Sequence, residues 1–163
     1  MNVELRPITI DRANTKYLGW LNDPEITEHL DTVTQPYTMQ QLRDFIGGMM
    51  ASPVDRFYAI LAAGFFVGTF RVGPRTDDTA WTGVMIGDRD LWGKGIATAA
   101  HLEAARIWGP RSGVSPLQML VGAANVKNIG AIRSMEKAGY RFRGYTEPPE
   151  SKYPAVVLER RLR

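Results

Sequence analysis

One short segment combines the residue types that bind anions: Trp92, Gly93, Lys94, Gly95, Ile96, Ala97 and Thr98. It follows an apolar stretch at 82–86 that predicts a strand, and an alanine-rich stretch after it predicts a helix to about Trp108. The first turn of a helix has unpaired backbone N–H groups, and the helix dipole adds partial positive charge there. Gly93 and Gly95 permit backbone conformations that a Cβ would obstruct, and Ala97 keeps the first turn slim. The pattern therefore predicts a cradle for a phosphate or pyrophosphate.

The segment matches neither of the two common nucleotide-binding loops. It lacks G-x-x-x-x-G-K-[ST], and G-x-G-x-x-G would need a glycine where Thr98 stands. The alternative is a turn whose glycines serve only packing, because short glycine motifs also match by chance. A second, independent pattern is needed to decide between the two.

The stretch 125–140 supplies such a pattern. It follows an apolar run at 117–124 and has the ends of a helix, since Asn125 or Asn128 can cap its start and Gly139 suits a left-handed C-terminal residue. Apolar residues recur at helical spacing, which predicts one buried face. From spacing alone, Asn128 is equally well interpreted as a plain cap or as a ligand contact.

Together the two segments resemble the GNAT superfamily of N-acetyltransferases. Its pyrophosphate loop is Q/R-x-x-G-x-G/A, and here Trp92 stands in the Gln/Arg position, with Gly95 and Ala97 at the two small positions. Its later signature is N-x-x-[AS]-x-x-x-x-E-K-x-G-[FY], with Asn128 at the asparagine and Tyr140 at the end. With tryptophan at this position, the loop resembles that of the branch containing the ribosomal-protein N-acetyltransferases and several amino-sugar acetyltransferases. The resemblance is strong over 83–140 and weaker elsewhere.

This resemblance implies that acetyl-CoA is the cofactor. Its diphosphate would lie on the backbone amides of the loop and near Lys94, because a tryptophan at position 92 removes a polar contact. Its pantetheine arm would pair with the fourth strand, in a gap where the fourth and fifth strands splay apart. The cofactor-binding residues implied in this way are Met85, Ile86, Trp92, Gly93, Lys94, Gly95, Ile96, Ala97, Thr98 and Asn128.

The implied reaction is direct transfer of an acetyl group from the CoA thioester to a primary amine of a small molecule. An alkylamine is mostly protonated near pH 7, so a base or a water chain must first remove a proton. Asp23 and Glu25 are the predicted bases, with Glu28 and His29 as further options. Asp23 stands before a proline, however, and capping a short helix is an alternative role for it.

The backbone N–H of Met85 or Ile86 is predicted to stabilise the oxyanion of the transfer step. Many family members provide a tyrosine that reprotonates the departing thiolate, and Met135 stands at that position here. Tyr140 or Tyr145 would need a favourable geometry to replace it, and water could serve instead. The acid is therefore left unassigned.

The acceptor is predicted less directly. The stretch 19–25 resembles the W-x-N-D-P-E segment of amino-sugar acetyltransferases, which favours an amino sugar or a nucleotide-linked amino sugar. A hydrogen-bonding corner of Asn22, Asp23 and Arg71 would suit hydroxyl groups, and some aromatic residues would face the ligand while most form core: Trp20, Tyr37, Phe57, Tyr58, Phe70 and Trp81. Two alternatives stay open: an N-terminal acetyltransferase of proteins, and a noncatalytic CoA-binding module.

The elements that must position these residues predict a mixed α/β fold, in the order β-α-α-α-β-β-β-α-β-α-β-β. This order matches the GNAT fold, with about seven strands, a splayed fourth and fifth strand, and four to five helices. We expect residues 1–163 to form one domain. The expected strands are 3–8, 56–62, 65–72, 80–87, 117–124, 140–145 and 153–160, with a hairpin at Ala63-Gly64 and a loop at 73–79.

Composition limits the remaining classes. The 163 residues contain no cysteine and two histidines, which argues against disulfides, thiolate metal sites and a histidine-rich metal centre. No apolar run approaches the roughly 18 residues of a membrane span, so a cytoplasmic protein is expected. The net charge of +3 suits a polyanionic cofactor without indicating nucleic acid. A homodimer paired through an exposed seventh strand is a further expectation.

Overall fold

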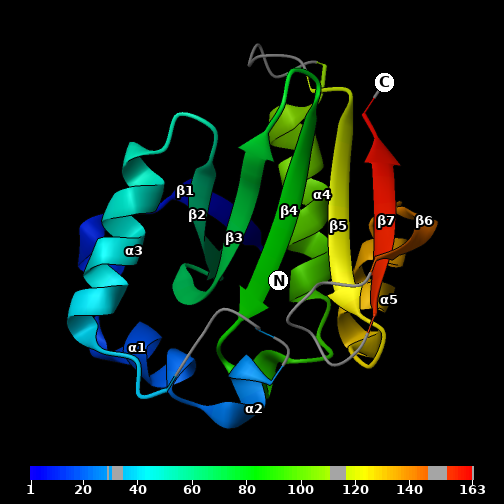
Figure 1. Cartoon of the computed structure of the whole chain (residues 1–163). Helices are drawn as coiled ribbons and strands as arrows, with labels where there is room; N and C mark the ends of the chain where they lie inside the picture. Colours follow the sequence, from blue (N-terminus) through cyan, green and yellow to red (C-terminus); the bar gives the residue numbers. More distant parts are fainter. Residues whose placement is uncertain (29, 31–34, 111–116, 147–153, 163) are drawn as a thin grey trace.

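The computed structural model describes residues 1–28, 30, 35–110, 117–146 and 154–162. These residues form a twisted seven-stranded sheet with the order β1-β2-β3-β4-β5-β7-β6 (Figure 1). Only the β4–β5 pair is parallel among the strand pairs of this sheet. The strands are β1 (Val3–Pro7), β2 (Arg56–Ala62), β3 (Phe65–Arg75), β4 (Thr79–Ile86), β5 (Met119–Asn125), β6 (Arg141–Thr146) and β7 (Ala155–Arg161).

Helices cover both faces of the sheet. One face carries α1 (Thr15–Leu21), α2 (Pro24–Thr27) and α3 (Met39–Ala51), and the other carries α4 (Ile96–Trp108) and α5 (Ile129–Lys137) (Figure 1). Short 3₁₀ turns, η1 (Ile10–Arg12) and η2 (Arg89–Leu91), precede α1 and α4. Each face has its own hydrophobic cluster, so the sheet separates two cores. The predicted mixed α/β fold with about seven strands is confirmed.

Local signals account for several of these elements. Helix α3 starts at a capping box, in which the Gln41 amide donates to Thr38 Oγ1 at 3.1 Å and the Thr38 amide donates to Gln41 Oε1 at 2.8 Å. The predicted hairpin between β2 and β3 turns at Ala63 and Gly64, whose φ angles of 49° and 84° match a turn with two left-handed residues.

Two expectations about the sheet were wrong. The stretch 73–79 is not a loop throughout, because β3 continues to Arg75 past a register shift that begins after Val72, and β4 already begins at Thr79. Strand β7 is not an exposed edge, since it pairs with β5 on one side and β6 on the other. The edges of the described sheet are β1 and β6.

The predicted splay of the fourth and fifth strands is confirmed. Parallel pairing runs from Thr79 opposite Met119 to Thr82 opposite Gly122 and then stops. Both strands continue beyond the last pair, β4 to Ile86 and β5 to Asn125. Figure 1 shows them diverging toward the end at which β4 turns into the segment before α4. Beyond Thr82 the edge of β4 therefore has no strand partner on the side of β5 among the described residues, and this separation of the two strands is here called the gap.

No helix in the described part of the chain has the length and hydrophobicity that crossing a membrane requires.

Candidate functional site

The N-terminus of α4 has the open backbone that an anion cradle requires. Its N-cap is Gly95, a left-handed residue with φ of 82°, and no side chain caps the first turn. The first intrahelical bond is donated by the Ala99 amide to the Gly95 carbonyl at 2.9 Å. The three preceding N–H groups, at 96–98, therefore have no partner one turn earlier in the helix. They can bind an anion together with the helix dipole.

The loop before this helix is exposed and held at both ends. Gly93 is left-handed, with φ of 75°, and a Cβ added to Gly93 or Gly95 would point into open space. Both glycines have a left-handed backbone conformation, which favours glycine, and at neither would a side chain clash with its neighbours. Lys94 is exposed, while the side chain of Ile96 is buried in the core and anchors the helix start. The cradle thus faces outward on a fixed base.

The free edge of β4 presents specific backbone groups to the gap. The Gly87 amide donates to the Val67 carbonyl on β3 at 2.9 Å. Since N–H directions alternate along a strand, the Met85 amide also points toward β3, and those of Val84 and Ile86 point to the gap. Of the two residues predicted to hold an oxyanion, the register favours Ile86. The Met85 side chain packs against the cluster under α1 and α3.

Trp92 lies between this edge and the cradle. Its indole Nε1 donates to the Ile86 carbonyl at 2.8 Å, and 47% of the residue is exposed. The bond ties the loop to the end of β4. Its role toward a cofactor stays a prediction.

Asn128 is an N-cap in the structure. Its side chain accepts a hydrogen bond from the Ala131 amide at 3.2 Å and so satisfies the first turn of α5. The neighbouring Asn125 accepts from the Lys127 amide at 2.8 Å and shapes the turn that precedes the helix. The capping interpretation of Asn128 is confirmed, and cofactor contact by its half-buried side chain stays a prediction.

The predicted bases lie together, but they are paired with a cation. Asp23 caps α2 by accepting from the Glu25 amide at 3.0 Å. Arg89, in η2, forms ion pairs with both carboxylates, its Nε lying 3.5 Å from Asp23 Oδ2 and its Nη1 contacting Glu25 Oε2. The hydrogen bond with Glu25, followed by the charges of Asp23 and Glu25, raises the pKa of Arg89. Sequence analysis missed Arg89, because no local motif marks it.

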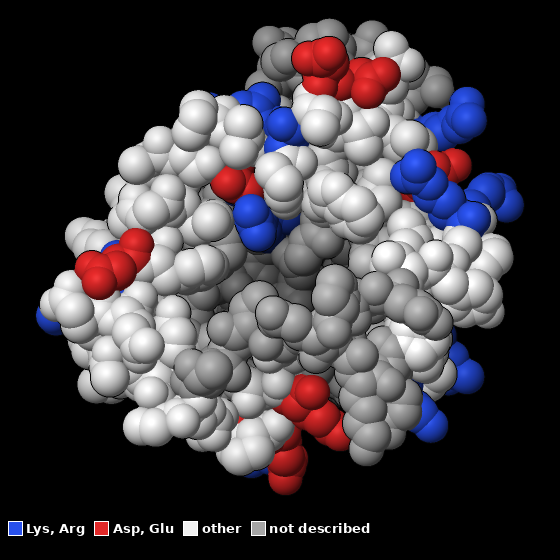
Figure 2. All heavy atoms as spheres, in the orientation of Figure 1, with Lys and Arg blue, Asp and Glu red and all other residues white. Residues whose placement is uncertain are grey.

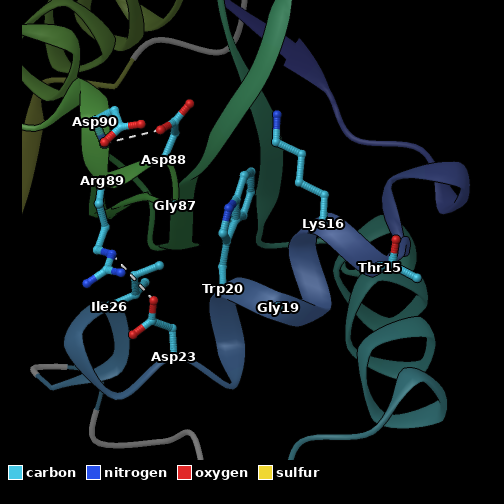
Figure 3. A pocket seen from close by; sticks show the side chains of 10 residues that line it. All are labelled: Thr15, Lys16, Gly19, Trp20, Asp23, Ile26, Gly87, Asp88, Arg89 and Asp90. Carbon is cyan, nitrogen blue, oxygen red and sulfur yellow. Dashed lines mark hydrogen bonds and ion pairs between the residues drawn. The ribbon is translucent and has the colours of Figure 1, made fainter.

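Asp23 and Arg89 border a hollow of ≈ 520 Å³ between α1, α2 and the segment after β4 (Figure 3). Trp20 lines this hollow, and a Cβ at Gly87 would lie 1.9 Å from the indole. Gly87 therefore lets α1 pack closely on the end of β4. Asp23, Asp88 and Asp90 carry carboxylates into the same region, and Lys16 and Arg89 carry cations.

The predicted hydrogen-bonding corner is not assembled. Asn22 is engaged with the backbone of Tyr37, donating to its carbonyl at 2.8 Å and accepting from its amide at 2.7 Å. Arg71 pairs instead with the buried Asp55, at 2.7 Å. Among the candidate aromatic residues Trp81 is 42% exposed, whereas four are buried in the core: Trp20, Phe57, Tyr58 and Phe70. Figure 2 shows that the face over β3 and β4 is hollowed. His29 lies outside the described residues.

A buried polar network, also missed from the sequence, lies where β4 and β5 separate. The Tyr140 hydroxyl is 3.3 Å from Thr82 Oγ1 and 3.3 Å from His101 Nδ1, and Thr82 donates to the Val121 carbonyl at 3.3 Å. Burial, with the charge of Arg160 as a smaller cause, lowers the pKa of His101 to about 4. Burial raises the pKa of Tyr140 to about 12. Both groups are neutral near pH 7.

Within the described residues, no group of three or more histidine and carboxylate side chains is arranged to hold a metal ion. The site is therefore built from backbone amides, a free strand edge and a few buried polar groups.

Comparison with solved structures finds the same fold in several acetyltransferases. The aminoglycoside acetyltransferase AAC(6')-Ib with ribostamycin and coenzyme A has a TM-score of 0.83 at 19% identity, covering 99% of this chain and 94% of that chain. The microcin C7 self-immunity acetyltransferase MccE with acetyl-CoA and AMP has a TM-score of 0.83 at 17% identity, covering 98% and 92%. Spermidine N-acetyltransferase from Vibrio cholerae with CoA and spermine has a TM-score of 0.80 at 14% identity, covering 98% and 95%.

At these identities the solved structures show a shared fold. No curated protein matches the sequence significantly. The sequence does match the family described as acetyltransferase (GNAT) domain over residues 2–141, which is most of the chain. With the splayed strands and the open helix start in the expected places, the chain belongs to the GNAT acetyltransferase family.

Proposed function

We propose that this protein is an acetyl-CoA-dependent N-acetyltransferase that acts on a primary amine of a small molecule. The observation that carries the proposal is the uncapped start of α4 beside the free edge of β4. An anion and a strand-like arm need such a pair of surfaces, since a diphosphate binds free amides and an amide-bearing arm pairs with an open strand edge. Solved relatives contain CoA or acetyl-CoA, which supports this cofactor.

The residues that would hold the cofactor fit its chemistry. The amides at 96–98 and the left-handed Gly93 and Gly95 would bind the diphosphate, with Lys94 nearby. Val84 and Ile86 would pair with the arm, and Asn128 would contact it from the start of α5. When bound, the cofactor supplies an activated acyl group as a thioester. The amides of Val84 and Ile86 both face the gap, and the one beside the thioester would stabilise the negative charge that develops on the acyl oxygen.

The amine has to lose a proton, and Asp23 and Glu25 remain our candidates for the base. Arg89 is ion-paired with one oxygen of each carboxylate, so the amine would have to reach the other oxygen. A water chain through the hollow is the other route. Substitution of Arg89 separates the two routes, because it changes the pH dependence of the rate only in the first.

We infer that the acceptor is an amino sugar or a nucleotide-linked amino sugar. Asp23, Asp88 and Asp90 border the hollow together with Lys16 and Arg89, and a protonated amine can pair with one of these carboxylates. Solved relatives are complexes with the amine-rich ribostamycin and spermine, and with AMP. The competing acceptor is the N-terminus of a peptide, which a protein N-terminal acetyltransferase would use. A cytoplasmic location and a homodimer are parts of the same proposal.

A noncatalytic CoA-binding module is the second candidate, and one observation favours it. Both predicted bases are ion-paired with Arg89, and Met135 stands where many family members have a tyrosine. Such a protein would bind CoA and release no thiol.

Thiol release from acetyl-CoA with a panel of amines tests these functions. The panel contains amino sugars, nucleotide-linked amino sugars, polyamines and N-terminal peptides, and calorimetry with CoA is run alongside. We expect CoA binding and the fastest turnover with an amino sugar. Faster turnover of a peptide would instead support a protein N-terminal acetyltransferase. CoA binding without turnover of any amine would support the noncatalytic CoA-binding module. Absence of CoA binding would contradict all three.

A further inference from the structure

Three side chains converge on Gly122, the last residue of β5 that pairs with β4. A Cβ built on Gly122 would lie 2.4 Å from Met135 Sδ, 3.3 Å from Thr82 Oγ1 and 3.7 Å from Tyr140 Cε1. Gly122 is the partner of Thr82 in the final β4–β5 pair. Thus a thioether, a hydroxyl and a phenol ring meet where the gap between the strands closes.

This junction is packed. Met135 is 4% exposed, Tyr140 is 3% exposed and Thr82 is 9% exposed. Met135 belongs to the cluster between the sheet, α4 and α5, so helix α5 presses its side chain onto β5. The absence of a Cβ at Gly122 is what admits the sulfur, because any larger residue there would displace Met135. The closed end of the gap is therefore a wall of close-packed atoms.

The direction of a bound arm follows from the strand. The cradle lies after the free end of β4, and the free edge runs from Ile86 back toward Thr82. An arm that starts at the cradle and pairs along this edge points its far end toward the junction. The side chain of Val84 packs against the same cluster as Met135, so it borders the last part of that path.

We propose that Met135, with Tyr140 and Thr82, forms the end wall of the acyl site and restricts this protein to short acyl groups. The proposal rests on the proposed binding of acetyl-CoA and specifies which acyl-CoA is accepted. Met135 is the adjustable part, because it is unbranched and reaches the junction from α5 alone. Tyr140 and Thr82 are held by hydrogen bonds to His101 and to the Val121 carbonyl.

The hydrogen bonds of Tyr140 also support a structural role in the wall rather than a role as the proton donor to the departing thiolate. With its pKa raised to about 12 by burial, the Tyr140 phenol is a weaker acid than a thiol, whose ordinary pKa is about 8.5. Burial of the phenol therefore disfavours proton transfer from Tyr140 to a thiolate. The hydroxyl instead fixes the ring in place through Thr82 and His101.

The test compares the affinities of CoA, acetyl-CoA, propionyl-CoA and butyryl-CoA by calorimetry, without any acceptor amine. We expect the wild-type chain to bind acetyl-CoA at least about tenfold more tightly than butyryl-CoA, because one methylene is worth roughly that factor in a close-fitting pocket. Met135→Ala should reduce this ratio at least about tenfold. Met135→Leu conserves volume and should keep the wild-type ratio.

The outcomes are separable from those of the proposed function. If the wild-type chain does not bind CoA, the proposed function is wrong, and the end-wall proposal, which rests on it, fails with it. If CoA binds and Met135→Ala has the same acyl ratio as the wild-type chain, the wall is wrong. Met135→Val makes a smaller change and replaces Met135→Ala if that variant does not fold, as judged by circular dichroism. An unchanged ratio in a folded Met135→Val variant would equally overturn the proposal.

Discussion

At the scale of single residues, burial and backbone conformation decide what the candidate groups can do. His101 lies in the core with Nε2 lacking a hydrogen-bond partner among the described residues, and Nδ1 near the Tyr140 hydroxyl. The imidazole ring of His101 contacts the rings of Phe70 and Tyr140 edge to face, with ring centroids 5.0 Å apart in both cases. A charged imidazole has no place there, so the residue is a neutral part of the wall's support.

This environment predicts a pH-dependent stability. The folded-state pKa of His101 is about 4, below its ordinary value of 6.5, so the unfolded state binds the proton more tightly. The stabilising contribution is present above pH 6.5 and is lost as pH falls toward 4, by up to about 1.4 kcal/mol per pH unit. Urea denaturation between pH 7 and 5 should show this slope. His101→Asn retains an amide near the Nδ1 position and should show a smaller slope. Equal slopes would contradict the assignment.

Gly95 provides a prediction with a matched control. Gly95 and Gly64 have φ of 82° and 84°, and an added Cβ would meet nothing within 4 Å at either position. Valine should therefore cost each site a similar backbone strain, about 1–3 kcal/mol. Only Gly95→Val should also abolish CoA binding in calorimetry, since its side chain stands over the amides of α4. Equal CoA affinity in the two variants would show that the cradle is not the diphosphate site.

At the scale of elements, the site depends on where pairing stops and where helices begin. The β4–β5 pairing ends at Thr82, and the starts of α4 and α5 flank the gap that follows. The two helix starts differ, since Asn128 caps α5 with its side chain and Gly95 leaves α4 uncapped. An uncapped start costs helix stability and gains an anion site.

Asn128 and Thr38 separate capping from cofactor contact. Each caps a helix through its side chain, accepting a backbone hydrogen bond at 3.2 Å and 3.1 Å respectively. Replacing either residue with alanine should cost about 1 kcal/mol of unfolding free energy. If Asn128 also contacts the cofactor, Asn128→Ala should weaken CoA binding severalfold, and Thr38→Ala should leave it unchanged. The same CoA affinity in both variants would reduce Asn128 to a cap.

At the scale of the whole molecule, the distribution of charge matters more than its sum. The net charge is +3, yet Figure 2 shows acidic side chains in separate groups, over α2, at the opposite end over the β3–β4 turn and beside α3, while basic ones lie along the side of β6 and β7. A polyanion and a cationic amine can therefore be attracted to different parts of one small domain. The sheet edge on the basic side is β6, where Phe142 and Tyr145 are exposed.

The charge distribution predicts that CoA affinity depends on salt. Raising the salt concentration from about 0.05 M to 0.5 M shortens the screening length, so the affinity for CoA should fall severalfold. Acetyl-pantetheine has the arm but no phosphates, and its affinity should change little over the same range. Calorimetry at both salt concentrations measures the difference. A salt-independent affinity for CoA would place the phosphates away from the cradle and Lys94.

The sequence by itself determined the features that depend on neighbouring residues. The turn at Gly93 and Gly95, the cap at Asn128 and the hairpin at 63–64 follow from glycine conformations and a side-chain cap that act within one turn of chain. The order of strands and helices, with the splay, followed from the two motifs and their resemblance to a family.

Only the tertiary structure decided which distant side chains meet. It paired Arg89 with Asp23 and Glu25, placed β7 inside the sheet and brought Thr82, His101 and Tyr140 together. It also directed the Met85 amide away from the gap, because that direction depends on the register with β3. Periodicity and propensity describe one segment at a time, whereas these contacts depend on how separate segments pack and pair across the sheet.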